Sequence, residues 1–172
     1  MKAKWILLAI VLAPPVASFS AYAAGGNQLS RHDKVWMKKA HQVNMAEIKA
    51  GQLAEKQGKA AVIKQVGHTL ISDHRMLDRQ LTQAAHALGV SLPDMPSAKQ
   101  IATMQMLQTK SGAKFDKTWA RAMLHAHMKA INKTEMEISR ASSPKVKQLA
   151  QKTLPVLQTH LNMLQKAETK LK

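Results

Sequence analysis

Four side chains with metal-ligating chemistry interrupt otherwise apolar helical stripes in this sequence: Glu47, His74, His127 and His160. The segment LPVLQTHLNMLQKAETKLK is the clearest case, because it places His160 on a stripe of apolar residues spaced by threes and fours. A polar group on such a stripe faces a protein core, where it must be hydrogen-bonded, paired or bound to a metal. One carboxylate and three imidazoles form a ligand set that suits a transition metal.

Two interpretations of these four residues stay open. In the first, all four bind one ion, and the closed set of three nitrogens and one oxygen suits Zn²⁺, with Fe or Cu(II) as alternatives. In the second, they form a metal-free buried network in which histidines bond to backbone carbonyls and Glu47 is an ion-pair partner. A tetrahedral ion held by all four groups has no open position, which favours a structural or storage role over an enzymatic one. If one group only hydrogen-bonds to a ligand, an open position would permit redox or hydrolytic chemistry.

The elements that must position these side chains are helices. Helical periodicity fills most of the chain after residue 30, and no run shows the alternation of a strand. Ser30 with Asp33 is a capping pair, and Ser143 followed by Pro144 is an N-cap with proline at the first helical position. We predict long helices over about 31–57, 59–88, 116–140 and 144 to the end, and a short helix over about 97–110.

Four long amphipathic helices predict an all-α four-helix bundle. The long connection between the second and third, with its own short helix, resembles a crossover and predicts an up-down-down-up order. The four interrupting residues lie within about a turn of the helix midpoints, near residues 44, 74, 128 and 158. Because midpoints of packed helices lie at similar heights, these side chains should converge at one level of the core. Pro155 should kink the last helix, since it lacks a backbone N–H.

Other soft or basic ligands lie off these stripes. His125 is two residues from His127, so the two imidazoles point to different sides of the helix and cannot chelate together. Met37, His41 and Met45 form an i, i+4, i+8 row whose thioethers and imidazole could attract Cu(I). Core packing with one exposed histidine is the alternative interpretation of that row.

The N-terminus has the pattern of a secretory signal. Two lysines precede an apolar run over residues 5–13, and Ala21-Tyr22-Ala23 is a small-x-small cleavage site. The apolar run is shorter than the roughly 20 residues that a spanning helix needs. We therefore predict a signal peptide over residues 1–23 and one helical bundle domain over 24–172. The domain is expected to be exported to the periplasm or the extracellular space.

Composition limits the partners and the chemistry. The chain has no cysteine, so it has neither disulfides nor thiolate ligands for a metal. Lys and Arg number 26 against 10 Asp and Glu, a net charge of +16, which becomes +14 without Lys2 and Lys4 of the signal. Such a field favours acidic partners, and for an exported protein these are anionic membrane surfaces or envelope polysaccharide. Aromatic residues are scarce, so specific nucleic-acid binding is not expected.

Several motifs resemble one family. The segments NMAEIKAGQLA, ISDHRML, GAKFDKTWARAMLHAHMKAI and LPVLQTHL resemble the ferritin-like family of exported bacterial proteins catalogued as domain of unknown function 4142, over roughly residues 33–164. The family pattern falls on Glu47, Asp73-His74, His127 and His160. The resemblance implies a ferritin-like fold and the same four residues, but no reaction. The chain has no Glu-x-x-His motif, which disfavours the carboxylate-rich dinuclear site of other ferritin-like proteins.

Overall fold

The computed structural model describes residues 29–171, and all the regular structure in that part of the chain is helical. The predicted signal peptide lies outside the described residues. Five helices follow in chain order: α1 (Arg31–Gln57), α2 (Ala61–Ala87), α3 (Ala98–Gln108), α4 (Gly112–Arg140) and α5 (Pro144–Lys170). None of the helices between residues 29 and 171 combines the length and apolar character needed to cross a membrane.

The helix starts follow the local sequence chemistry. Ser30 and Asp33 form the predicted capping box at α1, because the Ser30 side chain accepts the Asp33 N–H and the Asp33 carboxylate accepts the Ser30 N–H. Ser143 caps α5, with Pro144 at its first position. The predicted start of α4 at residue 116 is wrong, because the helix begins at Gly112. The positive φ of 56° at Gly112 turns the chain into the helix one turn earlier.

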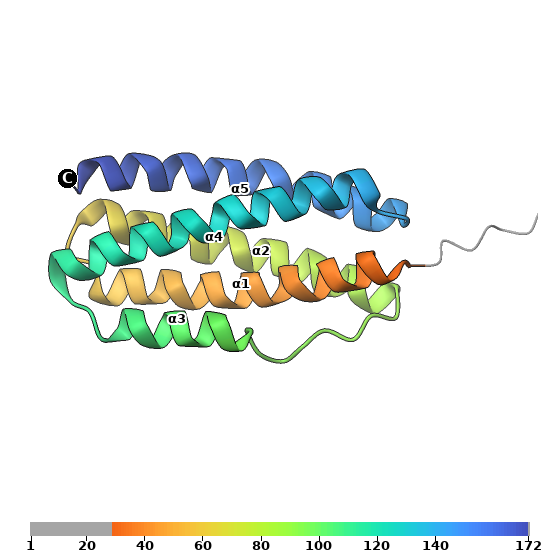
Figure 1. The fold of residues 1–172 in the computed structure, drawn as a ribbon, viewed down its shortest axis with the longest axis horizontal. Coiled ribbons are helices and arrows are strands. Elements are labelled where there is room, and N and C mark those ends of the chain that lie inside the picture. The colour runs from red at the N-terminus through yellow and green to blue at the C-terminus, as the bar shows by residue number, and fades with distance from the viewer. Residues whose placement is uncertain (1–28, 172) are drawn as a thin grey trace, which may run out of the picture.

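The long helices are arranged up-down-down-up, as predicted (Figure 1). α1 packs against α2 and α4, and α5 packs against α4 and α2, so that each neighbouring pair is antiparallel. The connection from α2 crosses to the other end of the bundle and carries α3, which lies along α1 (Figure 1). The molecule is therefore a ferritin-like four-helix bundle with a long crossover and a short extra helix. α5 is one uninterrupted helix through Pro155.

Two glycines bring α1 and α2 close together. A Cβ atom added at Gly51 would lie 2.6 Å from the Gly67 carbonyl oxygen, and one added at Gly67 would lie 2.6 Å from the Ala54 Cβ. Neither position has room for a side chain, because backbone and methyl groups of the facing helix occupy that space. This contact fixes the distance between the helices that carry Glu47 and His74 one to two turns away.

The apolar core is divided into two halves. One cluster, centred on Phe115, Trp119 and Leu164, fills the half of the bundle near the α1–α2 turn. The other, centred on Trp36 and Val146, fills the half near the α4–α5 turn. Between the two halves lie the buried polar residues Asn44, Glu47, His74, His127 and His160. The predicted site residues thus form a polar layer that crosses the middle of the bundle.

Candidate metal centre

Each long helix contributes one predicted site residue to the polar layer. Glu47 comes from α1, His74 from α2, His127 from α4 and His160 from α5. The side chains are almost fully buried, with Glu47 the most exposed at 3%. The stripe periodicity and the similar heights of the helix midpoints account for this convergence, as predicted.

The three imidazoles lie against one another. Ring centroids are 5.8 Å apart for His74 and His127, 5.2 Å for His74 and His160, and 5.3 Å for His127 and His160. One ring nitrogen of each histidine lies within 4.8 Å of the corresponding nitrogen of the other two. Three ligand atoms from three helices therefore surround one point in the core.

Asn44 fixes the tautomer of His74. The Asn44 Nδ2 group donates to Asp78 Oδ1 at 3.2 Å, and a carboxylate only accepts, so the amide oxygen of Asn44 faces His74. His74 Nδ1–H then donates to Asn44 Oδ1 at 3.0 Å. Nε2 of His74 keeps its lone pair, is fully buried, and has no hydrogen-bond partner within residues 29–171.

The other two histidines are held in the same way. His127 Nδ1–H donates to the Met123 carbonyl oxygen at 3.0 Å, which leaves the lone pair on Nε2. His160 Nε2–H donates to Asp73 Oδ2 at 2.9 Å, which leaves the lone pair on Nδ1. In known metal sites, a hydrogen-bond acceptor on the outer ring nitrogen, the one that does not bind the metal, orients each histidine in this manner.

These tautomers leave two lone pairs facing each other. His127 Nε2 and His160 Nδ1 are 3.2 Å apart, a distance at which neutral acceptors repel unless a cation lies between them. Two nitrogen ligands about 2.05 Å from a tetrahedral ion are separated by roughly 3.3 Å, which is close to the observed spacing. A proton shared by the two nitrogens is the alternative. The donor set and its spacing fit a small transition-metal ion.

Burial makes a proton the weaker candidate for that position. Desolvation lowers the pKa of His74 well below 6.5, and the neighbouring His127 and His160 lower it further. Burial also lowers the pKa of His160, although its bond to Asp73 opposes the change. His74 and His160 are therefore held in the neutral state, in which imidazoles ligate metals.

Glu47 lies in the layer but outside the group of three inward nitrogens. Its Oε1 atom is 3.7 Å from His127 Nδ1, the outer nitrogen of that ring, and its Oε2 atom has no hydrogen-bond partner among the described residues. Burial raises its pKa, and the electrostatic interaction with His127 opposes that effect. The sequence predicted four inward ligands, and the structure brings three nitrogens together with a carboxylate beside them.

Two residues that support the layer were not predicted. Asn44 lies one helical turn before Glu47, so the i, i+3 spacing was a signal that it faces the same core. Asp73 is part of the family pattern but was assigned no role, and although it is one-third exposed its carboxylate reaches His160. The Met37–His41–Met45 row separates, because Met37 is buried among apolar side chains and His41 pairs with Asp78 at 2.7 Å.

The fold and site define a class: a ferritin-like four-helix bundle whose central layer is rich in histidine rather than carboxylate. The chain belongs to the family described as domain of unknown function DUF4142, whose model matches residues 18–167. No curated protein sequence matches it. The solved structure of a DUF305 fragment from Deinococcus radiodurans is similar, with a TM-score of 0.73 over 83% of this chain and 98% of that chain. Identity is 12%, so the likeness concerns the fold alone.

Proposed function

We propose that this protein is exported and holds one transition-metal ion in its core through His74, His127 and His160. The observation that carries the proposal is the 3.2 Å contact between two inward lone pairs, on His127 Nε2 and His160 Nδ1, whose rings are fixed by acceptors on their outer nitrogens. Glu47 supplies the compensating negative charge, and rotation of its side chain would provide the fourth ligand. Export rests on the signal pattern of the N-terminus.

The surroundings of the layer favour metal holding over catalysis. Two depressions on the surface lie at the start of α5 and around Lys117, Arg121 and Leu171. Neither is lined by a residue of the histidine layer, so neither is a route for a substrate to the proposed ion. Three nitrogens and one oxygen suit Zn²⁺ best, with Cu(II) and Fe as the other candidates. The proposed role is therefore structural or storage binding.

The test is elemental analysis of untagged protein purified from its export compartment. We expect one ion per chain in the wild type, and its loss in His160→Gln, which keeps polarity and approximate size. His125→Gln is the matched control, because His125 is exposed on the same helix as His127 and should keep the ion. Wild-type protein without stoichiometric metal would contradict the proposal.

A metal-free polar network makes a different prediction for the same variant. In that case His160→Gln would lower the free energy of unfolding equally with and without a chelator, because only protein hydrogen bonds are lost. Under the metal proposal, the chelator lowers wild-type stability and has no effect on His160→Gln, since an ion that binds only the folded state stabilises it. Thermal unfolding with and without EDTA separates the two.

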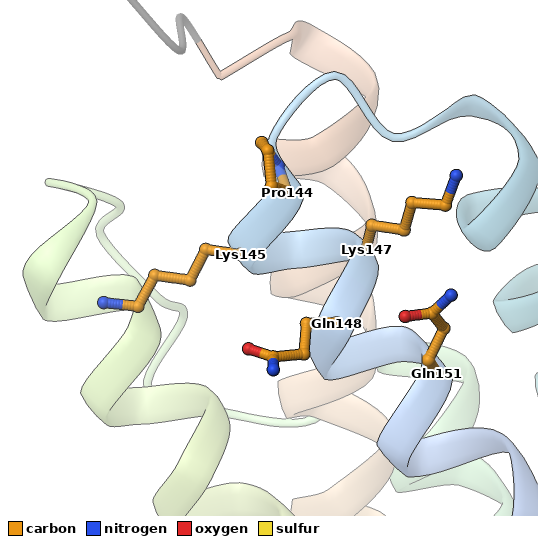
Figure 2. A pocket seen from close by; sticks show the side chains of 5 residues that line it. All are labelled: Pro144, Lys145, Lys147, Gln148 and Gln151. Atoms are coloured by element: carbon orange, nitrogen blue, oxygen red, sulfur yellow. The ribbon is translucent and has the colours of Figure 1, made fainter.

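The basic surface supports a second proposed role, in binding anionic membranes or envelope polysaccharide. The net charge is +16, and the lysines are spread over many helix faces. Figure 2 shows the depression at the start of α5, where Lys145 and Lys147 extend to opposite sides of the helix rather than toward one anion. Binding would therefore be diffuse and sensitive to salt. Co-sedimentation with anionic vesicles should fall steeply between low and physiological salt, and salt-insensitive binding would contradict this role.

A further inference from the structure

A second group of ligand atoms lies at the end of the bundle where α1 begins and α4 passes into α5 (Figure 1). Asp33 is its fixed member, with no exposed surface. The carboxylate accepts the backbone N–H groups of Ser30, Ser142 and Ser143 and the Ser142 hydroxyl. These bonds tie the start of α1 to the α4–α5 turn and hold the carboxylate in one orientation.

Glu137 is the member of this group that lacks well-aligned hydrogen bonds within residues 29–171. It lies in the last turn of α4 with no exposed surface, and neither carboxylate oxygen has a hydrogen-bond partner among the described residues. His32 Nδ1 lies 2.6 Å from Glu137 Oε2, but neither atom has the alignment of a hydrogen bond. The contact is an ion pair when His32 is protonated, and a bound cation would take the place of that proton between the two side chains.

The facing carboxyl groups of Asp33 and Glu137 also require a cation or a proton. Burial and the neighbouring Asp33 raise the pKa of Glu137 to about 7. Burial opposes ionisation of Asp33, but its bonds to Ser142 and Ser30 outweigh that effect and lower the pKa. A hydrogen bond between the two carboxyl groups exists only while Glu137 is protonated. Without such a proton, the two buried carboxylates that face each other are both acceptors.

We propose that His32, Asp33 and Glu137 form a second metal site, which takes a divalent first-row ion such as Zn²⁺ or Mn²⁺. One atom of each residue lies within 4.8 Å of the others, and one imidazole with two carboxylates is a ligand set for such ions. The side chain of His32 is 41% exposed, so an ion can enter from solvent and keep water in its remaining positions. The hydrogen bonds that the Asp33 carboxylate accepts from Ser30, Ser142 and Ser143 hold it in the orientation of a metal ligand.

The second site is separate from the histidine layer. Asp33 and Glu47 are fourteen positions apart on α1, and at about 1.5 Å per residue this places the two sites roughly 21 Å apart. An ion there would join the first turn of α1 to the last turn of α4, and would stabilise that end of the bundle. The inference does not depend on metal binding in the core.

The test is titration of chelator-stripped, untagged full-length protein with Zn²⁺, in competition with a chelator that removes weakly bound ions. We expect two ions per chain for the wild type, one each for His160→Gln and His32→Gln, and none for the double variant. His68→Gln is the matched control, because His68 also lies beside a glutamate, Glu55 at 2.9 Å, but no third ligand joins the pair within the part of the chain that the structure describes. This variant should keep both ions.

Each other outcome overturns one site. If wild type and His32→Gln bind equal numbers of ions, the second site is wrong. If wild type binds one ion and only His32→Gln loses it, the second site stands and the core proposal fails. Glu137→Gln guards against loss of binding through unfolding, because it removes a buried charge while keeping the shape. It should stay folded by circular dichroism and lose the same ion as His32→Gln, and retention of that ion would refute the site.

Discussion

Asp116 should be among the most costly residues to remove, although it is far from either proposed metal site. It is 1% exposed in the first turns of α4, and its carboxylate accepts the Lys59 N–H at 2.9 Å and the Ala60 N–H at 2.8 Å. The N-cap residue of α2 is Ala60, which has no side chain to cap the helix. Asp116 therefore holds from α4 the turn that leads into α2, and it places a negative charge near the positive end of that helix.

The magnitude follows from these two bonds. Hydrogen bonds to a charged group contribute about 1.5–3 kcal/mol each, and a buried donor left without a partner costs a similar amount. Lys59 is exposed, so water can replace part of that loss. We expect Asp116→Ala to lower the free energy of unfolding by about 2–4 kcal/mol, and Asp116→Asn, which keeps one acceptor, by about half as much.

The assay is urea unfolding in the presence of EDTA, so that metal binding does not contribute. Asp94→Ala is the control, because Asp94 is exposed in the crossover and should change stability by less than about 0.5 kcal/mol. If Asp116→Ala costs no more than Asp94→Ala, Asp116 does not hold the α1–α2 turn, and the reasoning is wrong.

Three further outcomes are expected. In metal-free protein the pKa of Glu137 is about 7, against 4.5 in the unfolded chain, so its contribution is fully present below pH 4.5 and is lost as pH rises through 7. The loss is on the order of 3 kcal/mol, and Glu137→Gln should remove most of it in unfolding measured near pH 5 and pH 8. Asp73→Asn should weaken metal affinity about 10–100-fold without changing stoichiometry, since it disturbs the bond that orients His160. Because burial lowers the pKa of His74 and His160, metal affinity should persist below pH 6.5, and a midpoint at the value of an exposed histidine would contradict this.

The sequence was sufficient to predict the bundle and three of the inward side chains. Stripes of apolar residues identify the buried face of each helix, and their interruption at His74, His127 and His160 identifies polar groups in the core. Similar helix lengths place these residues at one level. The position of Glu47 beside the outer nitrogen of His127 depends on side-chain rotation, which periodicity does not determine.

The second site could not be predicted from spacing. His32 and Glu137 are separated by 105 positions and lie at helix ends, where a small change in the α4–α5 turn decides which side chains meet. Neither residue falls on the stripes used to find the core. Asp33 binds the α4–α5 turn through backbone N–H groups. Because every residue except proline has such a group, the sequence does not identify which ones Asp33 contacts. The capping pattern predicted that Asp33 would cap the start of α1. The structure shows that its carboxylate also binds the backbone of the α4–α5 turn.

The most direct test of the central claim is anomalous X-ray diffraction from crystals of the untagged protein grown with Zn²⁺, with data on both sides of the zinc absorption edge. We predict an anomalous peak in the core at about 2.0–2.1 Å from His74 Nε2, His127 Nε2 and His160 Nδ1. The outer nitrogens should keep their bonds to Asn44, the Met123 carbonyl and Asp73. A core without an anomalous peak, with His127 Nε2 and His160 Nδ1 still 3.2 Å apart, would contradict the account and leave the histidine layer as a metal-free network.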